Sequence, residues 1–237
     1  MNVKDAEIQK RLEDHQLFKT SMYYEFNDQV ANNEDTDYWT FGSGAGANNA
    51  IDPNATGGDP PSKVLKASKG DAGAQNDECY IHGDGKYAIA VSPAARHYST
   101  VYMETKLKLA NTADCQAFWG LDLVGAMTAA YAEPAHDSII FFCDDGVGAN
   151  FMCRTYDAAE EETSSGIALD TSWHIYRIEW RFLSSPSVTF RIDGSVVSGH
   201  VTQVPNSALA PMYIVKTQEA TGDERSITRE YCWLWGE

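Results

Sequence analysis

The sequence has no apolar run long enough to span a lipid bilayer, and its first residues lack the apolar core of a secretory signal. We therefore expect no membrane partner and no entry into the secretory route for the chain as written. Its five cysteines are an odd number without C-x-x-C spacing, so neither a disulfide framework nor a zinc site is predicted. Cys143 and Cys153 flank a turn and could face each other across a hairpin, but free, buried thiols are the expectation.

Basic residues are few. The chain has 18 Lys and Arg against 34 Asp and Glu, a formal net charge of -16. Such a surface repels a phosphate backbone, which excludes nucleic acid as an expected partner. We interpret the charge as favouring solubility and opposing self-association.

Residues 173–194 predict a hairpin of two long strands. In the first strand, aromatic or apolar side chains alternate with largely polar ones, as on a strand with one buried face. Asp193 and Gly194 supply a turn that accepts positive φ. The aromatic and apolar row is His174, Tyr176, Ile178, Trp180 and Phe182, and the opposite row is Ile175, Arg177, Glu179 and Arg181.

Similar short segments, separated by turn residues, follow one another from residue 22 to residue 235. Residues 101–110 alternate, 115–124 form a continuously apolar run typical of a central strand, and 138–156 predict a second hairpin. The acidic segment 157–165 is predicted to be an exposed loop. About a dozen strands without βαβ alternation indicate an antiparallel two-sheet sandwich.

One helix is predicted, over residues 3–20. Its apolar residues are Ile8, Leu12, Leu17 and Phe18. A helix this short is marginal in water unless it docks, either on the sandwich or on another chain. The expected division is an anchoring arm at 1–20 and a β domain at 21–237.

The pattern W-H-x-Y-x-I-E-W, a turn, then V-x-F-x-I-D-G at 173–194 resembles the concanavalin A-like jelly rolls. This fold is shared by legume lectins, laminin-G-like modules, family 16 glycoside hydrolases and several polysaccharide lyases. The segments 116–121, 137–142 and 231–235 resemble jelly-roll virion proteins of tailed bacteriophages. The resemblance implies an all-β, antiparallel two-sheet jelly-roll sandwich with a short N-terminal helix.

The family's catalytic patterns are missing. Family 16 hydrolases use E-x-D-x-x-E, which does not occur here: Glu104 is alone on its strand, and 160–162 fall in the predicted loop. No nucleophile elbow supports serine or cysteine catalysis either. We therefore expect no enzyme of these types.

A polysaccharide lyase is the less favoured enzymatic alternative. The row Arg177, Glu179 and Arg181 could hold a carboxylate, and Tyr213, Lys216 and Gln218 distantly resemble the Y-x-K...Q strand of alginate lyases. The spacing of Tyr213 and Lys216 predicts opposite faces of a strand, however, and the family's Q-x-H element is missing between the two segments. The alternative hypothesis is that the charged row is simply the polar face of a sheet.

The main functional hypothesis is a non-enzymatic bacteriophage virion protein: a capsid decoration, head-fibre or tail-surface component. The resemblance implies other virion proteins of the capsid or tail as partners, a homo-oligomer, and location in a virion assembled in the host cytoplasm. Residues 1–20 would attach the domain to the particle.

The alternative hypothesis is a carbohydrate-binding module, in which exposed aromatic rings stack on sugars. Tyr38, Trp39 and Tyr131, in or beside predicted loops, are its candidate residues, with glycans as partners. No cofactor is expected. The loop acids Asp28, Glu34, Asp35 and Asp37 could bind calcium, but they match no EF-hand spacing.

Overall fold

The computed structural model describes residues 21–24, 40–43, 50–52, 63–67, 78–83, 98–125, 136–144, 146–182, 185–218 and 225–236. Side chains are described from residue 78 onward within these ranges, except residue 79. The predicted helix at 3–20, with Ile8, Leu12, Leu17 and Phe18, lies outside the described residues. In the described part of the chain, no helix is long and apolar enough to cross a membrane.

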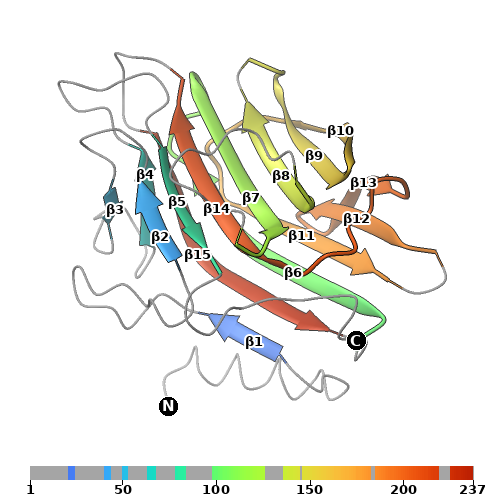
Figure 1. Cartoon of the computed structure of the whole chain (residues 1–237). Helices are drawn as coiled ribbons and strands as arrows, with labels where there is room; N and C mark the ends of the chain where they lie inside the picture. The colour runs from blue at the N-terminus through green and yellow to red at the C-terminus, as the bar shows by residue number, and fades with distance from the viewer. Residues whose placement is uncertain are drawn as a thin grey trace.

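The described residues form two antiparallel sheets packed face to face (Figure 1). Sheet A has the strand order β13-β12-β11-β6-β15-β4-β3, with β1 also paired to β15, and sheet B has the order β10-β9-β8-β7-β14-β5-β2. The strands are β1 (Ser21–Tyr24), β2 (Thr40–Ser43), β3 (Ala50–Asp52), β4 (Lys63–Ala67), β5 (Glu78–His82), β6 (Thr100–Leu109), β7 (Cys115–Leu123), β8 (Ser138–Asp144), β9 (Asn150–Asp157), β10 (Ala159–Ala168), β11 (His174–Arg181), β12 (Ser187–Ile192), β13 (Ser195–His200), β14 (Leu209–Thr217) and β15 (Arg225–Gly236). This confirms the predicted all-β jelly-roll sandwich.

The predicted hairpin at 173–194 is confirmed as β11 and β12. Trp180 pairs with Val188, and Tyr176 pairs with Ile192. Asp193 and Gly194 adopt φ values of 50° and 82°, as the turn requires. β11 also pairs with β6, so the hairpin joins the middle of sheet A rather than standing alone.

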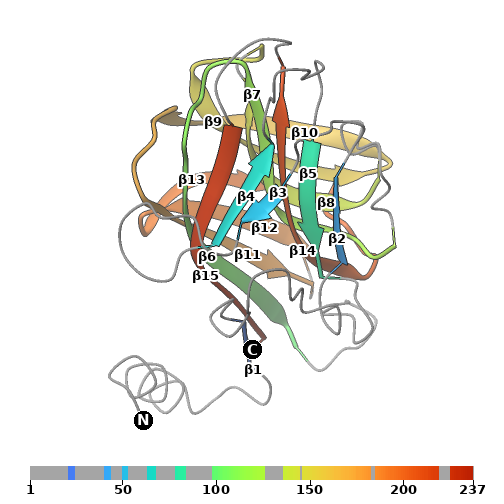
Figure 2. The same ribbon diagram turned by 90° about the vertical axis from the view of Figure 1, so that its left-hand side faces the viewer.

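Aromatic side chains fill the space between the sheets. Trp119 of sheet B lies 4.8 Å, centroid to centroid, from Tyr176 of sheet A, and Phe141 lies 5.1 Å from Phe190. These contacts between rings of the two sheets fix how the sheets face each other. Figure 2 shows the other end of the sandwich, where β4 of sheet A and β5 of sheet B lie side by side.

Four cysteines, Cys115, Cys143, Cys153 and Cys232, are free and buried in the described part of the chain. Burial raises the pKa of the Cys232 thiol above its usual range, so it stays protonated at neutral pH. The prediction of free, buried thiols is confirmed for these four.

The acidic segment is not a loop, and that prediction is wrong. Residues 159–168 form β10, the edge strand of sheet B, in which Glu160 pairs with Tyr156 and Glu162 pairs with Arg154. Glutamates are poor strand formers in general, which is why the segment resembled a loop. Charged side chains are nevertheless common on edge strands, where they oppose pairing with other chains.

A buried histidine joins the edges of the two sheets where β10 of sheet B meets β13 of sheet A. His200 is completely buried, and its Nδ1 and Nε2 are hydrogen-bonded to the hydroxyls of Thr155, at 2.9 Å, and Thr163, at 2.7 Å. Burial lowers the pKa of His200 below its usual value near 6.5. The imidazole is therefore neutral in the folded protein at neutral pH.

Replacing His200 with glutamine is expected to cost about 1–3 kcal/mol of unfolding free energy at pH 7.5, because two buried hydroxyls lose their partner. Because the native pKa is lowered, the wild type loses stability as the pH falls below about 6.5, the unfolded pKa. H200Q lacks that loss, so the gap between the two proteins should narrow from pH 7.5 to pH 5. Urea unfolding at several pH values measures it; a gap that widens toward acid contradicts the assignment.

Candidate functional site

The predicted sugar-binding residues Tyr38, Trp39 and Tyr131 lie outside the described residues. The predicted lyase residues are described, and the structure does not bring them together. Arg177 lies on the outer face of sheet A, where its guanidinium binds Glu104 Oε2 with an Nη2–O distance of 2.5 Å. Lys216 lies on the outer face of sheet B, on the opposite side of the sandwich.

Tyr213 lies between the sheets, on the face of β14 opposite Lys216, and the spacing of the two residues predicts opposite faces. It is 1% exposed, and its hydroxyl donates a hydrogen bond to Thr105 Oγ1 at 3.0 Å. Burial raises the pKa of Tyr213 far above its usual range. A buried, protonated phenol cannot take a proton from a polysaccharide lying on either outer face.

The charged row of β11 is neutralised from neighbouring strands. Arg177 pairs with Glu104 of β6, and Glu179 accepts a hydrogen bond from Arg191 Nε of β12 at 2.7 Å. Glu104 and Glu179 are only 5% and 8% exposed, so this face is less open to solvent than the sequence predicted. The row is a set of cross-strand ion pairs that stabilises sheet A.

A different group of polar residues comes together on the outer face of sheet B. The strand register places Asp122 of β7 opposite Ser138 of β8, Ser138 opposite Tyr156 of β9, and Tyr156 opposite Glu160 of β10. Directly opposite residues share a face and lie about 5 Å apart. Four strands therefore contribute one continuous row of polar side chains.

The next row on the same face adds a cation and a further carboxylate. Arg154 of β9 lies opposite Glu162 of β10, and its Nε donates a hydrogen bond to Glu162 Oε1 at 2.5 Å. Arg154 Nε also lies 3.8 Å from Glu160 Oε2, and its guanidinium lies 4.8 Å above the ring of Phe142. One cation is thus shared by two carboxylates.

His136, just before β8, completes the group. Its Nε2 lies 2.8 Å from Asp122 Oδ1. That hydrogen bond raises the pKa of His136 more than partial burial lowers it, and the charges of Asp122 and Asp137 raise it further. We call the seven residues the polar corner: Asp122, His136, Ser138, Arg154, Tyr156, Glu160 and Glu162.

The polar corner differs from the rest of this face. Its neighbours along the sheet form an apolar cluster of Tyr80, Phe118, Ile140, Phe142, Met212 and Ile214, each at most 7% exposed. Within the polar corner, by contrast, the side chains of His136, Glu162 and Glu160 are 25%, 27% and 56% exposed. Solvent, and hence a ligand, reaches this face of sheet B at the polar corner.

Two buried oxygens below the exposed groups have unused hydrogen-bonding capacity. Among the described side chains, Asp122 Oδ2 and Ser138 Oγ are buried without a hydrogen-bond partner. Buried polar atoms of this kind are usually satisfied by ordered water or by a ligand. Asp122 also lies near His82, whose Nε2 is 3.8 Å from Asp122 Oδ2.

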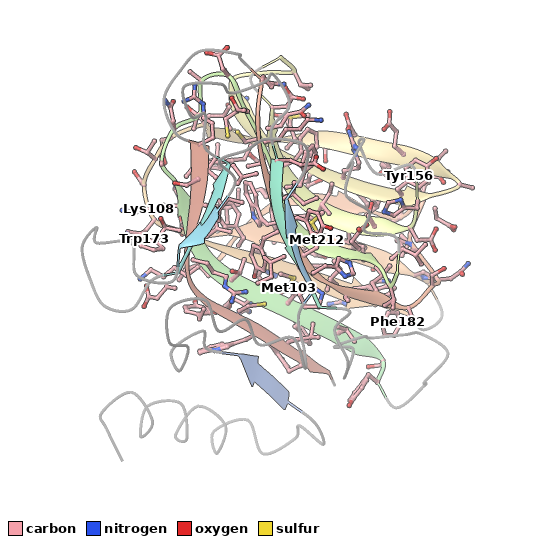
Figure 3. All side chains as sticks on the ribbon, turned by 60° about the vertical axis from the view of Figure 1, so that its left-hand side comes forward. Met103, Lys108, Tyr156, Trp173, Phe182 and Met212 are labelled. Atoms are coloured by element: carbon pink, nitrogen blue, oxygen red, sulfur yellow. The ribbon has the colours of Figure 1, made fainter. Side chains whose placement is uncertain are left out.

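Tyr156 supplies an aromatic ring at the open side of the polar corner. It is half-buried on β9 and, in Figure 3, lies on the opposite side of the view from Trp173 and Lys108, which belong to the sheet A side. An aromatic ring beside carboxylates is the arrangement that stacks on a sugar ring and binds its hydroxyls. No group of three or more His, Cys, Asp or Glu in the described ranges is arranged to hold a metal ion.

Sequence reasoning missed the polar corner because its residues are spread from 122 to 162. The useful signal was the alternation of Met152, Arg154 and Tyr156 with buried neighbours, continued by Glu160 and Glu162 two residues apart. That alternation predicts shared faces on each strand. The pairing between strands, which joins the faces, is not local.

No protein-family model and no curated protein sequence matches the chain. Among solved structures, the endo-1,3-beta-glucanase of Streptomyces sioyaensis has a TM-score of 0.63 at 13% identity, covering 90% of this chain and 94% of that one. The laminarinase catalytic domain of Thermotoga maritima gives 0.61 at 14%, covering 93% and 98%. The carbohydrate recognition domain of Emp47p gives 0.57 at 9%, covering 91% and 94%. At these identities the similarity shows that the chain has the jelly-roll sandwich fold of carbohydrate recognition domains and glycoside hydrolases.

Proposed function

We propose that this protein is a non-catalytic carbohydrate-binding domain that binds glycans at the polar corner. The observation that supports it most is the half-buried side chain of Tyr156, which lies opposite the exposed Glu160 on one side and opposite Ser138, with its unsatisfied Oγ, on the other. Sugars present an apolar ring face together with hydroxyl groups, which this arrangement complements. Solved structures with the same fold include carbohydrate recognition domains and glucanases.

The arrangement of the acids favours binding over hydrolysis. A glycosidase places two carboxylates on either side of the bond to be cleaved. Glu162 instead engages Arg154, and Glu160 lies 3.8 Å from the same guanidinium. The two acids surround one cation, and the strand β8 between Asp122 and Arg154 presents Ser138, Ile140 and Phe142 on this face.

Replacing Tyr156 with alanine is expected to weaken glycan binding about tenfold or more, because the stacking surface is lost. The measurement is a glycan array followed by calorimetric titration of the best neutral oligosaccharide, with β-1,3-glucan oligomers included. Trp173→Ala, which removes a half-buried ring near Lys106 and Lys108 of sheet A, is the matched control and should leave affinity unchanged. If only the Trp173 variant loses binding, the glycan site lies on the sheet A side and the proposed site at the polar corner is refuted.

Attachment to a virus particle through residues 1–20 stays a prediction from the sequence. Its support is the amphipathic pattern of that segment and the acidic composition of the chain. Glycan binding is compatible with it, since a surface domain of a particle can contact glycans. The absence of enzymatic activity likewise stays part of the proposal.

A further inference from the structure

The polar corner has an excess of negative charge. Asp122, Glu160 and Glu162 are its three carboxylates, and Arg154 is its one permanent cation. The Arg154 side chain is 4% exposed, and its guanidinium is bound by Glu162 and lies 3.8 Å from Glu160, so little of its charge is offered to a ligand. Lys216 shares this face but lies on the row of Glu78 and Gln116, at the far end of the apolar cluster.

The most exposed carboxylate of the corner lies opposite an aromatic ring on the neighbouring strand. Glu160 is 56% exposed and pairs directly with Tyr156 across the strands. A ring face and a carboxylate side by side attract an ammonium group, through the ring quadrupole and through an ion pair. A uronic acid would bring another carboxylate, which accepts hydrogen bonds only and is repelled by Glu160.

The buried oxygens of Asp122 and Ser138 also bear on which ligand groups can bind. Ser138 is completely buried, lies between Asp122 and Tyr156 in the register, and its hydroxyl has no partner among the described residues. Asp122 Oδ2 is an acceptor without a donor. A water or ligand group bound to Asp122 Oδ2 must donate a hydrogen bond to it, which ammonium and hydroxyl groups do and a carboxylate does not, whereas Ser138 Oγ can donate or accept.

Resting on the proposed function, we propose that the polar corner selects glycans containing amino sugars, such as oligomers of 2-amino-2-deoxyglucose, over their neutral N-acetylated counterparts, and rejects oligouronates. The ammonium lies beside Tyr156 and pairs with Glu160. The sugar ring that carries it stacks on Tyr156, and Arg154 holds Glu162 in place at the edge of the site.

The test is calorimetric titration of the full chain with three hexamers of matched length: glucosamine, N-acetylglucosamine and galacturonate. We expect the glucosamine hexamer to bind at least tenfold more tightly than the acetylated one at low salt, and the galacturonate hexamer to show no binding. Glu160→Gln should remove most of that preference, because it lowers the affinity for the glucosamine hexamer more than the affinity for the acetylated one. Added salt should weaken only the glucosamine complex.

Glu230→Gln is the matched control, because it removes one exposed charge from the sheet A side. The inference is overturned if E230Q weakens the glucosamine hexamer as much as E160Q, since binding then reflects total charge. It is also overturned if the neutral or acidic hexamer binds as well as the amino one. Binding of neutral glycans without an amino preference refutes the inference alone, whereas failure of every glycan on the array and of all three hexamers refutes the proposed function together with it.

Discussion

Gly120→Ala is expected to lower the free energy of unfolding by about 3 kcal/mol or more. A Cβ at this position would lie 2.3 Å from the carbonyl oxygen of Ile139 and 2.8 Å from Cα of Ile140. Both atoms belong to the backbone of β8, so no flexible side chain can move aside. The φ of Gly120 is +150°, a conformation that side chains also disfavour.

The control for this variant is Gly148→Ala, in the turn between β8 and β9. A Cβ there meets nothing within 4 Å, so the unfolding free energy should change by no more than about 0.5 kcal/mol. Urea denaturation followed by circular dichroism measures both variants. If G120A is as stable as G148A, then β7 and β8 do not approach as closely as described. We also expect G120A to weaken glycan binding at the polar corner, because Asp122 and Ser138 lie on these two strands.

Trp119→Ala is expected to cost about 4 kcal/mol of unfolding free energy. Trp119 is completely buried and lies edge-on to Phe151 and Tyr176, with Phe141 stacked at 6.3 Å. Its removal leaves a large cavity between the two sheets, and packed aromatic neighbours can fill such a cavity only in part.

Trp119→Phe separates packing from hydrogen bonding. In the described part of the chain, the indole Nε1 of Trp119 is buried without a hydrogen-bond partner, so phenylalanine loses volume but no hydrogen bond. We expect W119F to cost about 1–2 kcal/mol, clearly less than W119A. Equal losses in the two variants, measured by urea unfolding, would mean that the indole nitrogen has a partner that stabilises the core.

The strands themselves were largely predictable. Alternation along 101–109 correctly predicted that Met103 and Leu107 face the core and that Lys106 and Lys108 face outward. The continuously apolar run of β7 correctly predicted a central strand, which lies between β8 and β14. These predictions succeed because the side-chain period of a strand is a local property.

The acidic strand was not predictable in the same way. Glu160 and Glu162 belong to β10 because Tyr156 and Arg154 of β9 pair with them at the edge of sheet B. That pairing outweighs the low strand propensity of glutamate, and solvent on the outer side accommodates the charges. Once the segment is a strand, two acids that looked like loop residues share a face with Arg154.

The sequence by itself determined which side chains of the alternating strands are buried, that the sheets are antiparallel and that the chain turns at Asp193 after the second strand of the hairpin, because alternation and turn preference act over a few residues. Only the tertiary structure decided that Tyr213 lies inside while Arg177 and Lys216 lie on opposite outer faces. It also decided which residues come together in the polar corner. Residues from four strands become neighbours there through cross-strand register, and register follows from how the two sheets pack together rather than from any one segment.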